Sequence, residues 1–593
     1  MILPSNSLNL RIITIMRYTQ TKILSFMKHS TKLSKTLCLL VCLFMGSAFT
    51  AAAADFMVDS ICYNIIGENQ VEVTSRDVKY TGEVIIPATV MNDGITYQVT
   101  RIGNNAFSGC SSMTLVGIPE GVTEIGKYAF FQCFRLENID LPNSLVSIGR
   151  AAFMMCYSFT AFHVPRNLAT IEYDALTYLE NLAYYTSSTL NTHFKAVDGV
   201  LYSKDLTRLV AYPPAAPATT FDIPSTVTSL GDYCFCSSKL TQVNIPESVT
   251  WMDMNIFRNC KELVSVDLPD GITHMGINVF GSCTNLTSVH LPASLDTLPN
   301  STFSYCTKLT TVTVPRNVSC ISNQAFIAAE NLKSVIIQEG SRLNEIGEYA
   351  FRECYSLETL IMPNTVTKIG NACFYQCHNI KNLHVSENLT ETGTGLFWDC
   401  YELTSAAIIG DIPEMKNLFY NCTSLKRLQI GSKHNTPGTT LLKNCTIARC
   451  NQLEYLELGA NIDTLESSAL PDIDNLKVLI CWAPTPPRCD GYWHSFGPNP
   501  STLNCVLYVP KASLEAYRTA NEWKKFKTIV PIDDLGDVNG DSAVNMDDLT
   551  ALINILLTAD IAARDLPLAD TNLDGAIGMD DLTALINILL TGN

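Results

Sequence analysis

Side chains that carry oxygen recur at alternate positions in two short segments near the C-terminus. In calcium-binding loops, ligands at positions one, three and five wrap one face of the ion. A backbone carbonyl fills position seven, and a carboxylate at position twelve closes the shell at the start of a helix. Hard oxygen ligands of this kind favour calcium over softer metals. The pattern therefore predicts two calcium ions, bound by Asp537, Asn539, Asp541, Ala543, Asn545 and Asp548 and by Asp570, Asn572, Asp574, Ala576 and Asp581.

Each of these loops is followed by the same thirteen residues, 546–558 and 579–591, so the tail is a duplicated unit of 33 residues. From residue 536 onward it has ten acidic residues and one basic residue, and two divalent ions would relieve this self-repulsion. An EF-hand closes with Glu and has a second helix, whereas here Asp closes the loop and one helix is expected after it. Ser542 replaces the glycine of the second loop, which weakens the first predicted site. The alternative interpretation is an acidic turn without metal.

This arrangement resembles a type I dockerin over residues 536–593. The resemblance implies a small all-α calcium-loop domain that docks to a cohesin domain on a scaffold protein. It also places partner recognition at the two positions before the last ligand of each loop. Those positions are Met546 and Asp547 in the first half, and Met579 and Asp580 in the second. Because the two pairs are identical, a twofold docking mode is expected. Many dockerins have Ser or Thr there, so the Met-Asp pair leaves the identity of the partner open.

Most of the chain before this tail repeats one phrase every 23 residues. The phrase places a Phe after Ala, a Cys three residues later in most copies, and Leu-x-x-Ile-x-Leu after that. A fixed period of 20–29 residues rich in Leu and Ile predicts a leucine-rich repeat solenoid. We expect an α/β-type repeat with one continuous parallel sheet and about 23 residues per coil, whose coils stack so that the Phe side chains form a single buried column. The matching positions include Phe107, Phe130, Phe153, Phe257, Phe280, Phe303, Phe326, Phe351, Phe374 and Phe397.

The 22 cysteines would ordinarily indicate disulfides in an exported chain. Here most of them occupy one repeat position. Equivalent positions on stacked strands lie about 4.8 Å apart, whereas an unstrained disulfide needs a Cβ separation of about 3.8 Å. We therefore expect a ladder of buried thiols that act as small apolar side chains. The spacing of Cys481, Cys489 and Cys505 does not decide whether two of them form one local disulfide.

The glycine of the Ile148-Gly149 turn is expected to adopt a backbone angle that other residues resist.

The chain divides into five parts. A basic stretch, a short apolar run and the small residues Ala51–Ala54 predict an export signal, with Met27 as an alternative start. Alternating apolar and polar residues then predict strands that form an N-terminal β cap, and Pro-rich residues after the repeats predict a C-terminal cap. We expect a signal peptide at 1–54, the N-terminal cap at 55–100, the solenoid at 101–460 with an inserted hairpin near 196–215, the C-terminal cap at 461–532, and the dockerin-like domain at 536–593.

The strand positions between core residues should face solvent. In two neighbouring coils they form a Ser/Thr-rich ribbon that offers hydrogen bonds with little charge: Thr287, Ser288, His290, Thr310, Thr311 and Thr313. The alternative is that these are ordinary solvated strand residues with high β propensity. A second cluster near the C-terminal cap is aromatic and is expected to fill an irregular core rather than to stack on sugars. It consists of Trp482, Tyr492, Trp493, His494 and Phe496.

The repeats resemble the BspA-like leucine-rich repeat family. The residues that carry the resemblance are the Ile-Gly-x-x-Ala-Phe-x-x-Cys phrases and Ile-Pro endings such as Ile118-Pro119, Ile223-Pro224 and Ile245-Pro246. Members of that family are surface or secreted proteins of bacteria and some protozoa, linked to adhesion to host proteins and to other cells. The resemblance therefore implies a secreted or cell-surface bacterial protein with an adhesive repeat surface.

Charge and motifs narrow the function further. The formal net charge is −17, and it is more negative without the basic first 54 residues, which argues against nucleic acid as a partner. No nucleophile elbow, phosphate loop or zinc-protease helix is present, and no stretch after the signal is long enough to span a membrane. We expect a calcium-binding, non-catalytic adhesion or interaction protein. Its partner is a cohesin-like module or a host or cell-surface protein, with a glycan left open. The alternative is an accessory component of a cellulosome-like, polysaccharide-degrading assembly.

Overall fold

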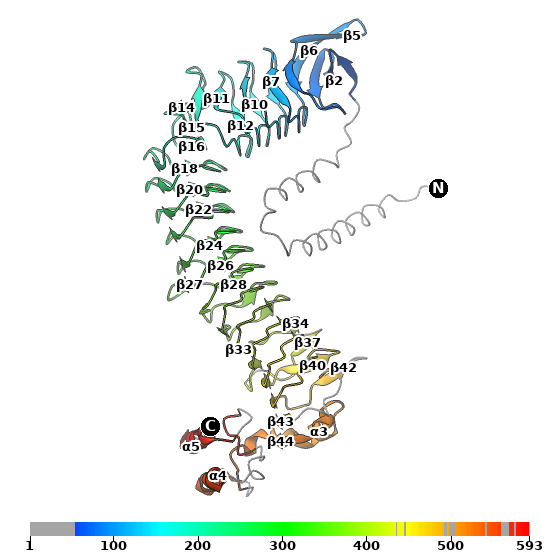
Figure 1. Cartoon of the computed structure of the whole chain (residues 1–593), viewed down its shortest axis with the longest axis vertical. Helices are drawn as coiled ribbons and strands as arrows, with labels where there is room; N and C mark the ends of the chain where they lie inside the picture. The colour runs from blue at the N-terminus through cyan, green and yellow to red at the C-terminus, as the bar shows by residue number, and fades with distance from the viewer. Residues whose placement is uncertain are drawn as a thin grey trace, which may run out of the picture.

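The computed structural model describes residues 54–434, 436–443, 446–471, 473–490, 495–496, 505–539, 543–558, 568–573 and 577–591. The expected signal peptide at 1–54 lies outside these residues, apart from Ala54. The described chain is a long, bent stack of coils with the N-terminal cap at one end and two helices at the other (Figure 1). No helix in the described part of the chain has the length and apolar character to cross a bilayer.

The N-terminal cap combines antiparallel and parallel strand pairs, and it continues into the first coils. Its strands are β1 (Phe56–Val58), β2 (Ile61–Gly67), β3 (Gln70–Thr74), β4 (Gly82–Ile85), β5 (Thr89–Asn92) and β6 (Ile95–Ile102). The antiparallel pairs are β1 with β2, β2 with β3, and β5 with β6, and the parallel pairs are β3 with β6 and β4 with β7 (Met113–Gly117). β5 and β6 form a hairpin in which Asn92 pairs with Ile95. Asp93 and Gly94 form its turn, with φ of 50° and 79°. β6 pairs in parallel with β8 of the first coil, so the cap covers the end of the stack.

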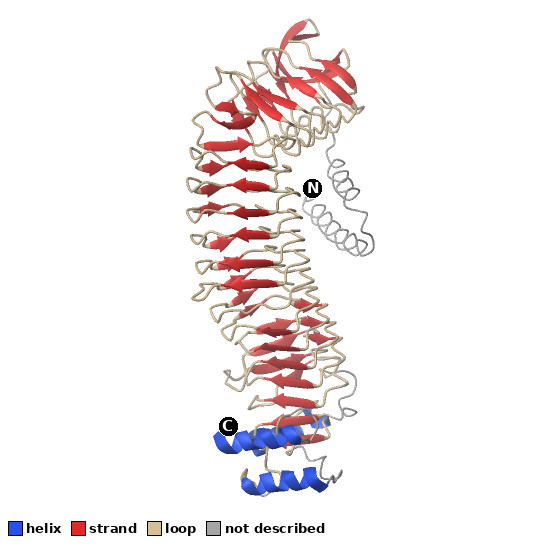
Figure 2. Ribbon diagram, turned by 60° about the vertical axis from the view of Figure 1, so that its left-hand side comes forward, coloured by secondary structure: helices blue, strands red, loops and turns tan. Residues whose placement is uncertain are grey.

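Most coils have a strand on one side and a second, usually shorter, strand on the other, as the successive arrows of Figure 2 show. The first set is β7 (Met113–Gly117), β9 (Asn138–Asp140), β11 (Ala161–Val164), β13 (Tyr184–Ser187), β17 (Thr220–Asp222), β19 (Gln242–Asn244), β21 (Ser265–Asp267), β23 (Ser288–His290), β25 (Thr311–Val314), β27 (Ser334–Ile337), β30 (Asn382–His384), β33 (Ser405–Ile408), β36 (Arg427–Ile430), β39 (Tyr455–Leu458), β41 (Val478–Cys481), β43 (Val506–Val509) and β44 (Thr528–Pro531). We call the outer side of this set the strand face.

The opposite set is β8 (Glu124–Ile125), β10 (Ser147–Ile148), β12 (Thr170–Ile171), β18 (Ser229–Leu230), β20 (Trp251–Met252), β22 (His274–Met275), β24 (Thr297–Leu298), β26 (Cys320–Ile321), β28 (Glu345–Ile346), β29 (Lys368–Ile369), β31 (Glu391–Thr392), β34 (Glu414–Lys416), β37 (Thr440–Lys443), β40 (Ile462–Glu466) and β42 (Arg488–Asp490). A third short set is β32 (Phe397–Trp398), β35 (Phe419–Tyr420) and β38 (Ile447–Ala448). Between the two main sets the Ala-Phe phrase forms turns whose backbone bonds the next coil, as Phe130 N does to Ala152 O at 2.8 Å. Within described residues 54–490 the coils contain strands and turns and no α-helix.

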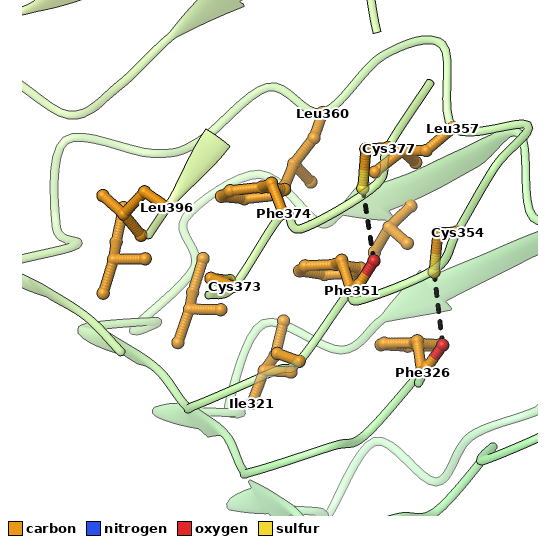
Figure 3. Close-up of a cluster of buried hydrophobic side chains, with 14 of the residues drawn as sticks. Ile321, Phe326, Phe351, Cys354, Leu357, Leu360, Cys373, Phe374, Cys377 and Leu396 are labelled. Carbon is orange, nitrogen blue, oxygen red and sulfur yellow. Dashed lines mark hydrogen bonds between the residues drawn. The ribbon is translucent and has the colours of Figure 1, made fainter. Parts of the chain in front are cut away.

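The phenylalanines form stacked columns inside the coils. From Phe257 to Phe419, neighbouring rings lie 5.0–5.5 Å apart and within 19° of parallel. Figure 3 shows three of them, Phe326, Phe351 and Phe374, one above another. The rings are fully buried, so each coil covers the apolar side of its neighbour, as a solenoid requires. This arrangement confirms the predicted leucine-rich repeat solenoid, with parallel sheets and about 23 residues per coil, although its described coils are built from strands and turns and not as the expected α/β-type repeat.

The prediction of one single column is wrong, because an inserted sheet divides the core in two. Leu176 stands where the repeat would place the next Phe after Phe153. Then β14 (Phe194–Val197), β15 (Val200–Ser203) and β16 (Arg208–Ala211) form an antiparallel meander between coils. Leu201 packs into the N-terminal core, whereas Tyr202 and Leu209 pack into the C-terminal one. The stack bends at this meander (Figure 1).

Two local predictions are also wrong. The strand face is not one continuous sheet, because its strands form separate sheets, with breaks between β9 and β11, β13 and β17, β23 and β25, and β27 and β30. At the last of these breaks, residue Thr359 makes a single bridge to Ser334, and a new sheet starts at β30. Gly149 does not have a positive φ. It is a glycine because a Cβ there would lie 2.9 Å from the backbone nitrogen of Lys127 in the preceding coil.

The C-terminal cap closes the last coil with β43, β44 and three short helical pieces. These are η3 (Lys511–Ser513), α3 (Leu514–Thr519) and η4 (Trp523–Lys525). Trp523 and Phe526 are buried. After η5 (Ile532–Asp534), the tail adds α4 (Met546–Thr558) and α5 (Met579–Thr591), which pack on a small core of their own around Leu552, Ile555 and Leu585.

Candidate functional site

The two closing carboxylates of the tail hold their loops in the same way. Asp548 is fully buried, and its Oδ1 and Oδ2 accept bonds from Asn539 N at 3.1 Å and from Asn545 N at 2.8 Å. Asp581 is 1% exposed and accepts the equivalent bonds from Asn572 N at 3.1 Å and Gly578 N at 2.7 Å. Each loop therefore folds back onto the carboxylate that starts its helix.

The acidic groups of these loops fit a hard cation. Asp537 and Asp570, at position one of each loop, are also buried. Taking carboxylates out of water is costly unless opposite charge compensates them, and a calcium ion would supply that charge and bind the oxygens. Among the described residues, no three His, Cys, Asp or Glu side chains gather as a metal-binding group. The predicted ligands Asp541, Asp574 and Ala576 lie outside the described residues.

The remaining described loop residues are placed as follows. Asn572 is half-buried beside its closing carboxylate, whereas Asn539 and Ala543 are exposed. The side chain of Asn545 caps helix α4, because its Oδ1 accepts the backbone N–H of Asp547 at 2.7 Å. This N-cap bond satisfies one of the free donors at the start of the helix. The Nδ2 of Asn545 also donates to the carbonyl of Ala543 at 3.3 Å.

The four predicted recognition residues are all exposed at the starts of the two helices. Met546 and Met579 are 63% and 66% exposed, and Asp547 and Asp580 lie beside them in the first turn. The sequence reasoning missed Leu557 and Leu590, which are 77% and 79% exposed. They lie eleven residues after each Met, on the same side of the helix at the 3.6-residue period. That periodicity, with leucines on both sides of each helix, was the signal that could have found them.

The predicted Ser/Thr ribbon is exposed on the strand face. All six of its side chains point to solvent: Thr287, Ser288, His290, Thr310, Thr311 and Thr313. Part of their hydrogen-bonding capacity is used along the ribbon. Thr287 Oγ1 donates to Val264 O at 3.1 Å, and Thr311 Oγ1 lies 3.3 Å from Ser334 Oγ. The ribbon is a flat polar surface.

The strand face is hollowed further along the chain, at the break after β27. A groove of about 560 Å³ lies between Ile361, which is 85% exposed, and the side chains of Arg427 and Tyr455. The Arg427 guanidinium lies 4.0 Å from the centre of the Tyr455 ring. Glu457 accepts bonds from Tyr455 Oη at 3.2 Å and from Trp482 Nε1 at 2.9 Å. The groove is thus polar and aromatic on one wall and apolar on the other.

The other predicted clusters are structural. Phe496 is buried against Trp523, with ring centres 4.8 Å apart, while Tyr492, Trp493 and His494 lie outside the described residues. Cys481, Cys489 and Cys505 form no disulfide with one another. Nine ladder thiols donate S–H bonds of 2.9–3.2 Å to the carbonyl of the Phe in the coil before, as Figure 3 shows for Cys354 and Cys377. They are Cys133, Cys156, Cys260, Cys283, Cys306, Cys354, Cys377, Cys400 and Cys422.

Comparison with known families accounts for both parts of the molecule. Residues 91–197, 215–333 and 344–477 match the BspA type leucine rich repeat region in 6 copies, and these ranges cover more than half of the chain. The chain belongs to the BspA-type leucine-rich repeat family. Residues 535–590 match the dockerin type I domain. Both resemblances seen in the sequence are thereby confirmed.

The comparison with solved structures finds other leucine-rich repeat proteins. A leucine-rich repeat protein from Bacteroides ovatus is 23% identical with a TM-score of 0.40, and the match covers 81% of this chain and 100% of that one. One from Eubacterium ventriosum is 22% identical with a TM-score of 0.40, over 58% of this chain and 93% of that one. A leucine rich cell surface protein from Faecalibacterium prausnitzii is 20% identical with a TM-score of 0.30, over 59% and 95%. No curated protein matches the chain.

The two modules set the broad function. Leucine-rich repeats and dockerins are non-catalytic, and together they support a role in protein interaction and docking. Dockerin type I domains bind calcium and cohesin partners. Both modules are typical of extracellular bacterial proteins.

Proposed function

We propose that this chain is an exported, non-catalytic adhesion protein. Its dockerin domain binds two calcium ions and attaches the chain to a cohesin-like partner, and its solenoid presents a long recognition surface. The main observation that supports the proposed attachment to a cohesin-like partner is a surface that α4 and α5 repeat. Each helix exposes a Met and an Asp at its start and a Leu near its end. Exposed apolar side chains at helical spacing are suited to a partner surface.

Binding to recombinant type I cohesin modules, measured by calorimetry with the full chain and calcium, tests the docking. Met546→Lys and Met579→Lys, made singly, should bind nearly as well as the wild type, because the other helix carries the same residues. The double variant should lose affinity on the order of a hundredfold, as for loss of a central anchor. Helical circular dichroism with calcium should be unchanged in all variants. Wild-type affinity in the double variant would exclude this surface, and failure of the wild-type chain to bind any cohesin would exclude the cohesin partner.

For the solenoid we propose a protein ligand on the strand face, at the Ser/Thr ribbon of residues 287–313 or at the groove beside Ile361. Both are outward-facing, and the groove offers a guanidinium, a carboxylate and aromatic rings for recognition. Such polar and aromatic walls also suit a glycan. The Thr311→Ala and Arg427→Ala variants, compared with the wild type for binding to host-protein and glycan arrays, test this proposal. Loss of binding in Thr311→Ala indicates the ribbon, and loss in Arg427→Ala indicates the groove. The array that shows the loss identifies the ligand class.

The rival function is that of an accessory component in a polysaccharide-degrading assembly, which the dockerin domain favours. Release of reducing sugar from plant or mucin glycans by the purified chain would contradict the non-catalytic proposal.

Export predicts a mature N-terminus close to Ala54 in protein isolated from culture medium or the cell surface, and mass spectrometry of the secreted chain tests it. A chain that retains residues 1–50 would contradict export by this signal.

A further inference from the structure

The strand face changes character at the C-terminal end of the solenoid. In the middle of the stack the strands alternate, as in β25, where outward residues are exposed and inward ones buried. In β41 all four residues, Val478–Cys481, are buried. Val478, Ile480 and Tyr508 form a separate apolar cluster on the outer side of β41 and β43, against which Trp482 is partly buried. An apolar outer face in this position requires a cover.

The cover comes from the tail. Ile532 and Leu535, in the segment that leads into the dockerin domain, pack on this cluster, and so does Leu573 from inside the second calcium loop. The lead-in segment is fixed further by Lys511, whose Nζ lies 2.7 Å from Asp534 Oδ1. Because Leu573 packs on the cluster that contains the fully buried Tyr508, the second loop lies beside that cluster. Figures 1 and 2 show the helices of the tail next to the last strands.

Leu573 is an unusual residue for its place. It stands at position four of the second loop, where the first loop has Gly540, although the helices that follow the two loops are identical. Its backbone has φ of 56°, in the left-handed region that leucine rarely adopts. A glycine would relieve this strain, so the packing of the leucine side chain must compensate for it. The first loop instead places Val538 in the dockerin's own core, at the position where the second loop has Thr571.

We propose that the last strands of the solenoid support the second calcium site, so that calcium binding by the Asp570–Asp581 loop and docking of the tail on the solenoid are one coupled step. The inference rests on the proposed calcium binding and concerns what makes the two sites unequal. Ligand binding and a second contact that both favour one conformation strengthen each other. Burial of one leucine side chain on this cluster corresponds to about a tenfold change in the calcium dissociation constant.

Calcium calorimetry on the full chain tests this proposal with one site left intact at a time. In an Asp548→Asn background, which leaves the second site, Leu573→Gly should weaken calcium binding about tenfold. In an Asp581→Asn background, which leaves the first site, Leu573→Gly should change nothing. If Leu573→Gly leaves the calcium dissociation constant of the second site unchanged or lowers it, relative to the same background with Leu573, the coupling is overturned. If neither background binds calcium, the proposed calcium function itself fails, and the two failures are thus distinguished.

Fluorescence gives a readout that is independent of affinity. Trp482 packs against the cluster that Leu573 covers, so calcium should change its emission in the full chain, and a Trp482→Phe variant identifies its share of the signal. This change should disappear in Leu573→Gly and in Val478→Asn, which alters the solenoid side of the contact. A calcium-induced change that persists in both variants would overturn the coupling.

Discussion

The solenoid and the dockerin domain are both built by repetition, but they satisfy their buried groups in different ways. In the solenoid each coil covers the apolar side chains of its neighbour and pairs with its polar groups. Phe303 is stacked between the rings of two neighbouring coils, and the Cys306 thiol donates a hydrogen bond to the Phe280 carbonyl at 3.1 Å. In the dockerin domain each repeat buries acidic groups in its loop, such as Asp548 and Asp581. Neighbouring coils can complete an apolar core, whereas buried carboxylates need a cation. The solenoid should therefore be stable without metal, and the tail should not.

Removal of calcium is the strongest way to break this comparison. With a chelator, the full chain should lose the helical signal of α4 and α5, because an uncompensated buried charge costs about 3–5 kcal/mol and the core of the tail is small. The strand signal and the main unfolding transition of the solenoid should remain. Circular dichroism during thermal unfolding, with and without chelator, measures both. The double variant Asp548→Asn/Asp581→Asn should behave like the chelated chain without any chelator. A helical signal indifferent to calcium would contradict the difference between the two regions.

Truncation of one ring in the column tests the solenoid side of the comparison. Phe303→Ala should lower the free energy of unfolding by about 3–5 kcal/mol, because it removes a fully buried ring and leaves a cavity. Coils contact only their neighbours, so hydrogen exchange should rise mainly near Phe280 and Phe326. Tyr305→Ala, two residues away at a side chain that is 53% exposed, is the matched control and should change stability by less than about 0.5 kcal/mol. Calcium binding should be unaffected in both. Equal effects of the two variants would contradict a shared buried column.

Features that depend on spacing within one repeat could be predicted from the sequence. The 23-residue period identified the coil, the stacked positions such as Phe280 and the outward ribbon, because every coil meets the same environment. The duplicated loop pattern identified Asp548 and Asp581, which the structure places at equivalent positions with equivalent bonds. In these cases a local pattern and its repetition determine the structure.

Features that depend on contacts between particular coils could not be predicted. The backbone of the preceding coil, and not the φ angle, requires a glycine at 149. The break after Thr359 and the division of the core at Leu201 depend on how single coils meet their neighbours. The packing of Leu573 on the cluster of Val478, Ile480 and Tyr508 joins residues far apart in sequence, and nothing local to any of them indicates it. The thiol bonds of the ladder were missed because a buried cysteine was considered only as a small apolar residue.

Thiol reactivity, the smallest effect expected, also tests whether the solenoid and the dockerin domain differ in their dependence on calcium. Burial raises the pKa of the Cys260 thiol to about 12, and it raises that of Cys306 as well. Only the thiolate reacts, and at pH 8, far below such a pKa, the ladder thiols are protonated as well as enclosed. Maleimide labelling of the native chain should therefore favour the half-buried Cys489 over Cys260 and Cys306, and guanidinium should make all of them react. The dockerin domain contains no cysteine, so a chelator that unfolds it should leave the ladder thiols unlabelled. Labelling of Cys306 after chelation alone would show that the coils also depend on calcium, and it would remove the distinction between the two regions.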